Sequence, residues 1–491
     1  MVRAVLLAGL WALPGPCEVP ADPRALSRTI SYGEMEDLLR KAARPGLVTV
    51  TEEARTHEGR KVYLVRLNRG GAKATFRALL YAQQHGNEVS GKDAQLCLIQ
   101  AVSRNPALLP EDVDLYLMPM LNPDGAEANR RTNGAKADLN RDHITLDQPE
   151  TQALHRVARR IMPHLAVDSH EFTKDGRDWG AQGWDARAWD SWPLITMDAL
   201  NVPWIPEPLR REALARVESA KAVMAKAGIP YARYTVGGPP PFAESRPSTT
   251  EVDDGRNSLG CLGALSFIIE AGVRREPGAP NDLGLRVDAY TRLYRHLLGT
   301  PASRRRVEAL CAQARKAPLP PWLATNFFWA NLGGRLSTVR VVERRTGRPL
   351  DVEAPHLMTD LVVKQSVRTP KAYVIDASAA PAFRTLLDRH GVAYEVLQSS
   401  SNQMAERCRL VRFEEAFDPL YGRYGNRQIV QQDAPVDRSF PPGSLLVSLD
   451  QPLARTAVGL LEPCLLYGIY GYPAYRALVA QDGTMPVWRL P

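Results

Sequence analysis

The sequence predicts an α/β fold: a mixed, mostly parallel sheet with helices on both faces, followed by a smaller α+β C-terminal domain. First, apolar runs of strand length alternate with segments of helical apolar spacing between residues 32 and 298. Second, a hairpin pattern around Glu58-Gly-Arg60 adds antiparallel pairing near the N-terminus. Third, a chain of 491 residues with 44% hydrophobic and 24% charged residues exceeds one ordinary globular core.

Each element follows from a local pattern. Residues 32–43 are amphipathic and predict the first helix, and Pro149 stands just inside the start of another, as is typical of helix N-termini. The turn Asn122-Pro-Asp-Gly125 ends a buried strand. We expect helices at 32–43, 92–102, 149–158, 209–227, 282–298 and 302–315, strands at 47–51, 61–66, 76–81, 165–171 and 265–270 and from 115 to the turn, and irregular chain at 172–208 and 235–242.

A proline-rich segment at 316–321 predicts a domain boundary. Beyond it we expect strands at 372–375, 393–397 and 408–412, and a helix at 380–390 that ends at Gly391. The predicted domains are therefore 22–316, which carries the candidate site, and 322–491, an accessory α+β domain whose sequence shows no chemistry of its own.

The first residues predict export. Met1-Val-Arg precedes the apolar run Ala4–Leu13, and Val19-Pro-Ala21 offers small residues for cleavage before Asp22. We interpret residues 1–21 as a signal peptide and expect a secreted or periplasmic protein; a frayed apolar N-terminus is the alternative. No other apolar run is long enough to cross a bilayer, so a stable membrane span is not expected.

Charge and cysteine usage narrow the function classes. The formal net charge of +8 is spread along the chain, without a Lys/Arg run interleaved with aromatic residues, so nucleic acid is not an expected partner. The six cysteines form no CxxC pair, which argues against a thiolate zinc site. The oligomeric state is not predicted.

Polar residues that suit a metal site follow the predicted strands. His85 and Glu88 lie between the strand 76–81 and a helix, and His170 and Glu270 each end an apolar run. A histidine and a glutamate three residues apart can converge on one cation, and two histidines with one glutamate and an open position form a catalytic zinc arrangement. The other seven histidines lack such a setting, and His155 and His296 are interpreted as surface or partly buried helix residues.

Four motifs, His85-x-x-Glu88, Asn122-Pro-Asp-Gly125, Asp138-Leu-Asn-Arg-Asp142 and Asp168-Ser-His-Glu171, occur in one order between Ser31 and Leu298. In these motifs the sequence resembles the zinc carboxypeptidase family, the carboxypeptidase A-like metallopeptidases, and its tyrosine-rich tail resembles those of some bacterial members. The resemblance implies a zinc carboxypeptidase-like fold and one Zn²⁺ per chain. The zinc ligands would be His85, Glu88 and His170.

The resemblance also implies roles around the metal. Glu270 matches the general base, and Arg131 the residue that stabilises the oxyanion, with Arg130 an alternative one position away. Asn140 and Arg141 match the pair that holds the terminal carboxylate of a peptide substrate, since a planar guanidinium binds a carboxylate through two parallel hydrogen bonds. Asp168 either points toward His170 or faces the sheet.

The sequence departs from the family upstream of Glu270. The mobile tyrosine of the family has no clean counterpart; Tyr231 and Tyr234 are nearest. Asp253, Asp254 and Arg256 stand there as candidates to line the substrate pocket. The expected activity is hydrolysis of C-terminal peptide bonds. The alternatives are a zinc amidase or deacylase, a cell-wall peptide hydrolase of the same fold, or a non-catalytic binding relative.

Overall fold

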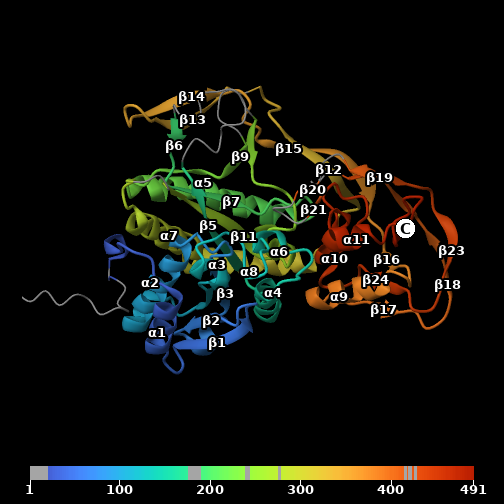
Figure 1. Cartoon of the computed structure of the whole chain (residues 1–491), viewed down its shortest axis with the longest axis horizontal. Coiled ribbons are helices and arrows are strands. Elements are labelled where there is room, and N and C mark those ends of the chain that lie inside the picture. Colours follow the sequence, from blue (N-terminus) through green and yellow to red (C-terminus); the bar gives the residue numbers. More distant parts are fainter. Residues whose placement is uncertain are drawn as a thin grey trace, which may run out of the picture.

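A computed structural model describes residue 20 and residues 22–174, 189–237, 244–274, 278–334, 336–413, 417–418, 423–424 and 428–491. Figure 1 shows the arrangement of these segments. Nearly all of the predicted signal peptide, residues 1–21, lies outside the described residues, so export stays a prediction. We call residues 22–316 the N-terminal unit and residues 322–491 the C-terminal unit; the position of this division also stays a prediction.

A mixed sheet of eight strands forms the N-terminal unit and confirms the predicted fold class. Its middle is parallel, with β3 between β4 and β5, and β5 between β3 and β11. Antiparallel pairing adds β2 to β4 and β7 to β11. In spatial order the strands are β1 (Val48–Arg55), β2 (Lys61–Asn68), β4 (Val113–Met118), β3 (Phe76–Ala82), β5 (Leu165–Thr173), β11 (Leu265–Val273), β7 (Ile195–Ala199) and β8 (Tyr231–Arg233).

Alternation along the strands gives the sheet two apolar faces. Leu80 belongs to the larger core and its neighbour Leu79 to the smaller one, as expected for side chains that point to opposite faces. The larger core takes side chains from α1 (Tyr32–Ala42), α2 (Ser90–Arg104), α5 (Glu207–Lys226), α7 (Leu283–Leu298) and α8 (Pro301–Lys316). The smaller core takes them from α4 (Pro149–Ile161) and α6 (Gly255–Cys261).

Three sequence expectations for this unit are wrong. The Asn122-Pro-Asp-Gly125 segment is not a free turn but the start of α3 (Pro123–Glu127), because Asn122 caps the helix by accepting a hydrogen bond from the Gly125 N–H (2.8 Å). The region 172–208, expected to be irregular, contains β6 (Trp189–Ser191) and β7. The helix α6 was not expected.

Short elements complete the N-terminal unit. They are η1 (Pro23–Ala25), η2 (Gly71–Lys73), η3 (Pro106–Leu108), η4 (Leu139–Arg141), β9 (Thr235–Gly237) and β10 (Ser245–Pro247). The strands β9 and β10 pair with each other, so the loop predicted at 235–242 begins with a short strand; residues 238–243 of that loop lie outside the described residues.

The C-terminal unit is richer in strands than predicted. Its central sheet has the order β17 (Glu395–Val396), β24 (Leu445–Ser448), β16 (Ala372–Ile375) and β25 (Val487–Leu490). The predicted helix is α9 (Ala380–His390), which ends where Gly391 adopts φ 69°. The other elements are β12 (Trp322–Ala330), β13 (Ser337–Glu343), β14 (Pro349–Ala354), β15 (Asp360–Arg368), β18 (Ser401–Ala405), β19 (Cys408–Phe413), β20 (Phe417–Asp418), β21 (Arg423–Tyr424), β22 (Gln428–Gln432), β23 (Val436–Phe440), α10 (Ala454–Leu461), η6 (Ile469–Gly471) and α11 (Pro473–Arg476).

Among the described residues, the two units are in contact at several places. The helices α9 and α10 lie beside α4 and α6 (Figure 1). The long strands β12 and β15 lead to the hairpin β13–β14, whose first strand pairs with β6 of the N-terminal unit. The C-terminal unit therefore contacts the N-terminal unit both through α9 and α10 and through β13.

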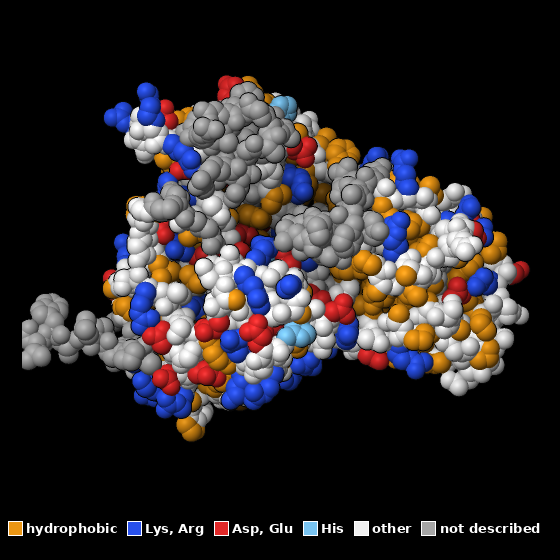
Figure 2. Space-filling model, in the orientation of Figure 1, with side chains coloured by type: hydrophobic (Ala, Val, Ile, Leu, Met, Phe, Trp, Pro, Cys, Tyr) orange, Lys and Arg blue, Asp and Glu red, His pale blue; other side chains and the backbone are white. Residues whose placement is uncertain are grey.

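Figure 2 shows basic and acidic side chains interspersed over the described part of the face drawn, with apolar side chains gathered on the C-terminal unit at the right. Among the described residues, no helix is both long enough and apolar enough to span a membrane. The five described cysteines are buried and carry free thiols.

A buried arginine holds the C-terminal unit together from inside. Arg489, on β25, has no exposed side-chain surface and pairs with Glu462 (3.1 Å), which is equally buried, and with Glu406. Tyr373 donates a further hydrogen bond to Glu462 (2.8 Å). The fully buried Glu462 carboxylate therefore depends on this guanidinium, whereas the Glu406 side chain is 13% exposed.

We predict that Arg489→Met lowers the free energy of unfolding by about 3–5 kcal/mol, because it leaves the buried Glu462 carboxylate without a cation. Arg40→Met is the matched control. Arg40 also forms an ion pair, with Asp37 (2.6 Å), but its side chain is 71% exposed. Its loss should cost less than about 1 kcal/mol. Chemical denaturation of the parent and both variants measures the difference, and equal losses would contradict this account.

Candidate active site

The candidate metal ligands come from one loop and one strand. His85 and Glu88 lie on the loop between β3 and α2, and His170 lies near the end of β5. All three are buried. The loop packs directly on α3, since a Cβ atom on Gly86 would stand 2.0 Å from the backbone carbon of Gly125. A side chain at position 86 would therefore push the loop and its two ligands away from α3.

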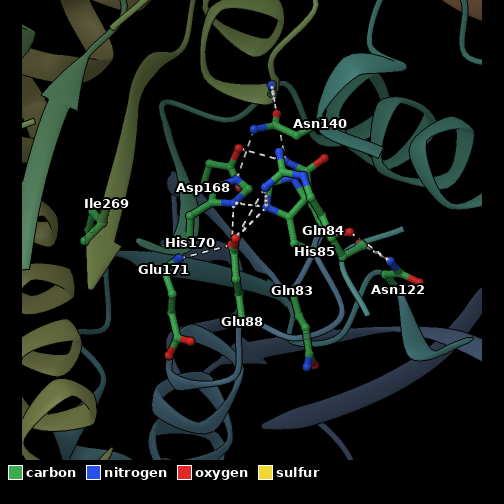
Figure 3. A network of polar contacts seen from close by, with 12 residues as sticks. Gln83, Gln84, His85, Glu88, Asn122, Asn140, Asp168, His170, Glu171 and Ile269 are labelled. Atoms are coloured by element: carbon green, nitrogen blue, oxygen red, sulfur yellow. Dashed lines mark hydrogen bonds and ion pairs between the residues drawn. The ribbon is translucent and has the colours of Figure 1, made fainter. Parts of the chain in front are cut away.

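The three side chains converge on one point, as predicted (Figure 3). One carboxylate oxygen of Glu88 lies 2.8 Å from His85 Nδ1, and the other lies 2.8 Å from His170 Nδ1. The two Nδ1 atoms are 3.1 Å apart. Within the described residues, this is the one cluster of three or more His, Cys, Asp or Glu side chains whose ligand atoms meet in this way.

The opposite ring nitrogens show that the cluster fits a cation. His85 Nε2 lies 3.1 Å from Asp138, and His170 Nε2 lies 3.0 Å from Asp168. An ionised carboxylate only accepts hydrogen bonds, so each Nε2 carries the proton and each Nδ1 presents a lone pair toward Glu88. Asp168 thus points toward His170 rather than away from it.

Charges around the cluster also favour a cation. Burial lowers the pKa of His170, but the charges of Asp168 and Glu88 outweigh burial and raise this pKa well above its usual value. Burial alone would raise the pKa of Asp138, yet His85 and Arg131 bring it below the usual range, so this carboxylate stays ionised. Two imidazoles and one carboxylate are a donor set that Zn²⁺ accepts.

Glu270 lies directly beside this cluster. The parallel pairing of β11 with β5 places Glu270 opposite His170, and its side chain is 7% exposed. Burial raises the pKa of the Glu270 carboxyl. The position and the raised pKa are those required of a carboxylate that exchanges protons near neutral pH.

The two neighbouring arginines point in different directions. Arg131 donates from Nε to Asp138 (2.9 Å), and its Nη1 lies 3.2 Å from His85 Nδ1. Arg130 instead donates to Thr132 O (3.2 Å) and Glu58 (3.2 Å), on the surface. Arg131 is therefore the one of the two that faces the site.

The predicted substrate pair separates into one buried and one half-buried side chain. Asn140 Nδ2 lies 3.3 Å from His170 Nε2, and Asn140 Oδ1 accepts from the Gly255 N–H (3.1 Å). Arg141 donates to Asn140 O (2.6 Å), and its Nε lies 3.7 Å from Asp253. Asn140 is thus held against a metal ligand, whereas the guanidinium of Arg141 lies closer to solvent.

The residues proposed for the pocket have different positions. Asp254 caps α6 by accepting from the Asn257 N–H (2.7 Å) and pairs with the fully buried Arg256 (2.7 Å), so both serve the fold. Tyr231 is also structural, since it donates to a backbone carbonyl of α5. Tyr234 is different: burial raises its pKa well above the usual value, and the charge of Glu270 raises it further, which indicates a phenol near the site.

Sequence reasoning missed two residues behind His170. Gln84 donates from Nε2 to Asp168 (2.8 Å), and its Oε1 lies 2.8 Å from His143 Nε2. His143 Nδ1 in turn lies 3.0 Å from His155 Nε2, and burial lowers the pKa of His143 to about 4. His155, interpreted as a surface or partly buried residue, is buried. Of these residues, only Gln84 could have been suspected from the sequence, because it directly precedes His85.

Parts of this chain match known carboxypeptidases in sequence. Residues 35–149 match the family model described as zinc carboxypeptidase. A probable carboxypeptidase 2 of Trichophyton verrucosum is 35% identical over 157 residues, which are 30% of this chain and 30% of that protein. Carboxypeptidase 2 of Trichophyton tonsurans is 30% identical over 251 residues, 48% of this chain and 46% of that protein. The chain therefore spans less than half the length of these curated relatives.

A crystal structure of a metallo-carboxypeptidase from Burkholderia cenocepacia aligns with a TM-score of 0.43 and 19% identity, over 57% of this chain and 69% of that one.

The contact between Asp168 and His170 gives a prediction about metal affinity. Asp168→Asn should weaken zinc binding about 10- to 100-fold, because an amide no longer fixes the proton on His170 Nε2. Asp198→Asn is the matched control, since Asp198 is equally buried, on β7, and pairs with Arg233 (2.9 Å) rather than with a ligand. Competition with a chelator measures both affinities; equal affinities in the two variants would rule out the assigned role of Asp168.

Proposed function

We propose that this chain, which matches the zinc carboxypeptidase family model over residues 35–149, is a zinc-dependent hydrolase that cleaves C-terminal peptide bonds. The observation that carries the proposal is the convergence of His85 Nδ1, His170 Nδ1 and Glu88, with a carboxylate behind each imidazole. The proposed substrate is a peptide with a free C-terminal carboxylate. Export rests on the sequence of residues 1–21 alone.

In this proposal His85, Glu88 and His170 hold one zinc ion per chain. Bound there, zinc would act as a Lewis acid that polarises the scissile carbonyl and makes water more acidic. Asp138 and Asp168 keep both imidazoles in the tautomer that leaves Nδ1 free to bind. These residues make the site ready for the metal without a change of rotamer.

The remaining residues act on the substrate. Glu270 accepts a proton from the attacking water and returns it to the leaving amine, for which its buried carboxylate and raised pKa are suited. Arg131 stabilises the negative charge that develops on the carbonyl oxygen, since its guanidinium is fixed by Asp138 (2.9 Å). Arg141 and Asn140 hold the terminal carboxylate and so select the last peptide bond.

The substrate assignment has a direct test. The parent protein is incubated with zinc and a pair of peptides that differ only in a free or an amidated C-terminus. Faster release of the last residue from the free acid supports a carboxypeptidase. Cleavage that ignores the terminus favours the amidase or deacylase alternative, and zinc binding without cleavage of either favours a binding relative.

His170→Ala tests the ligand set. We expect a folded protein that no longer retains stoichiometric zinc, because two of three ligands remain and His85 alone presents an imidazole. His296→Ala is the control: His296 lies on α7, 3.2 Å from Arg216 O, and should keep one zinc per chain. Metal analysis after dialysis gives the stoichiometry, and full zinc retention in His170→Ala would refute the assignment.

Glu270→Gln separates chemistry from architecture. The amide keeps the size of the side chain but cannot accept a proton, so turnover should fall by about 10²- to 10⁴-fold. Zinc content and melting temperature should stay near those of the parent, because the ligands are untouched. Peptide turnover and metal content are measured on the same preparations; near-parental turnover in the variant would remove Glu270 from the mechanism.

A further inference from the structure

The chain around Arg141 has little regular structure to hold it. We call residues 140–147 the clamp loop; only its start lies in a helix, the single turn η4. Part of the loop is organised from within, because the buried Asp142 carboxylate accepts from the Asp147 N–H (2.8 Å), the Gln148 N–H (2.9 Å) and the Thr145 hydroxyl (2.8 Å). Two of these bonds satisfy backbone N–H groups, whereas several backbone carbonyls of the loop have partners elsewhere.

Three of these carbonyls accept hydrogen bonds from side chains of the C-terminal unit. The bonds run from Tyr472 Oη to Arg141 O (3.0 Å), from His390 Nε2 to Ile144 O (2.7 Å) and from Arg389 Nη1 to Thr145 O (3.0 Å). The donors come from two separate places, the end of α9 and the residue that precedes α11. The C-terminal unit therefore holds the loop near its start and at its middle.

Two of the three donors are shielded from water. Tyr472 is 8% exposed and His390 is 2% exposed, so water cannot replace either as a donor. Burial lowers the pKa of His390 to about 3, and its ring is neutral at physiological pH. A neutral ring has one N–H, and the carbonyl acceptor fixes it on Nε2.

A second series of side-chain contacts connects the end of α9 to Asp168, the hydrogen-bond partner of the candidate ligand His170. The rings of His390 and His155 meet edge to face, with centroids 5.4 Å apart. From His155 the contacts continue through His143 and Gln84 to Asp168, with distances of 3.0, 2.8 and 2.8 Å. Because Asp168 is an acceptor, each N–H along this path points toward it.

We propose that the C-terminal unit is a positioning element for the substrate site, and that Tyr472 and His390 are the positioning residues through which it acts. They fix the main chain of the clamp loop and thereby the direction of the Arg141 guanidinium. The proposal deepens the proposed function and rests on it in one respect, the role of Arg141 in holding the substrate carboxylate.

Tyr472→Phe tests the first contact in the full-length zinc-loaded protein. Loss of one buried hydroxyl should raise KM for a free-acid peptide about 2- to 10-fold, with kcat and zinc content close to the parent. Tyr475→Phe is the matched control, because Tyr475 is equally buried three residues later and packs on Phe383 (5.3 Å). Its hydroxyl has no hydrogen-bond partner among the described residues, so KM should not change.

His390 permits a rescue experiment. His390→Phe keeps the ring but removes the donor and should raise KM over the same range. His390→Gln offers an N–H near the place of Nε2 and should return KM toward the parent value. A purely structural role for this side chain would predict the reverse, since phenylalanine preserves the buried ring better than glutamine does.

Hydrogen exchange of the clamp loop gives a readout that needs no turnover. Amides of residues 140–147 should exchange faster in Tyr472→Phe and His390→Phe, and at the parental rate in Tyr475→Phe. Unchanged exchange and unchanged KM in the first two variants would overturn this inference. A parent that cleaves no peptide while the two variants still loosen the loop would overturn the proposed function and leave the positioning role standing.

Discussion

The register of β5 between β3 and β11 is the constraint on which the site depends. Parallel pairing sets Asp168 opposite Tyr81 and His170 opposite Glu270. Since side chains alternate along a strand, Asp168 and His170 share one face, and Ser169 between them turns to the other face to meet Tyr294 of α7 (2.7 Å). A slip of one residue would turn the ligand and its carboxylate partner into the opposite core.

The candidate metal ligands and Glu270 could be predicted from the sequence because each lies at or just after the end of an apolar run. Strand ends at His170 and Glu270 and the loop at His85 and Glu88 are local patterns, and the structure brings the three candidate ligands together beside Glu270. The sheet they occupy was predicted for the same reason. Four buried strands are predicted by their runs of apolar residues. By contrast, β7 lies in a region rich in tryptophan and proline, a composition that predicts irregular structure.

The sequence could not predict contacts between residues that are far apart along the chain. Gln84 and His143 are 59 positions apart, and Tyr472 is 331 positions from Arg141. The helix α6 was missed because its glycines argue against a helix, yet Gly255 is needed where the chain passes close to Asp168: a Cβ atom there would stand 3.0 Å from its carboxylate. In α6 the tertiary contact at Gly255 therefore outweighs the low helix propensity of glycine.

The candidate site thus combines two kinds of support. The backbones of residues carried by strands, such as His170 and Glu270, are fixed by the backbone hydrogen bonds of the sheet. Residues on loops have no such backbone pairing, and each is held by a hydrogen bond to a charged or buried side chain. Arg131 donates to Asp138, and the backbone carbonyl of Arg141 accepts from Tyr472. In a zinc hydrolase the metal ligands and the base must hold one geometry, while the groups that bind different substrates benefit from loops. In our proposal the C-terminal unit gives the clamp loop the rigidity that the sheet does not give it.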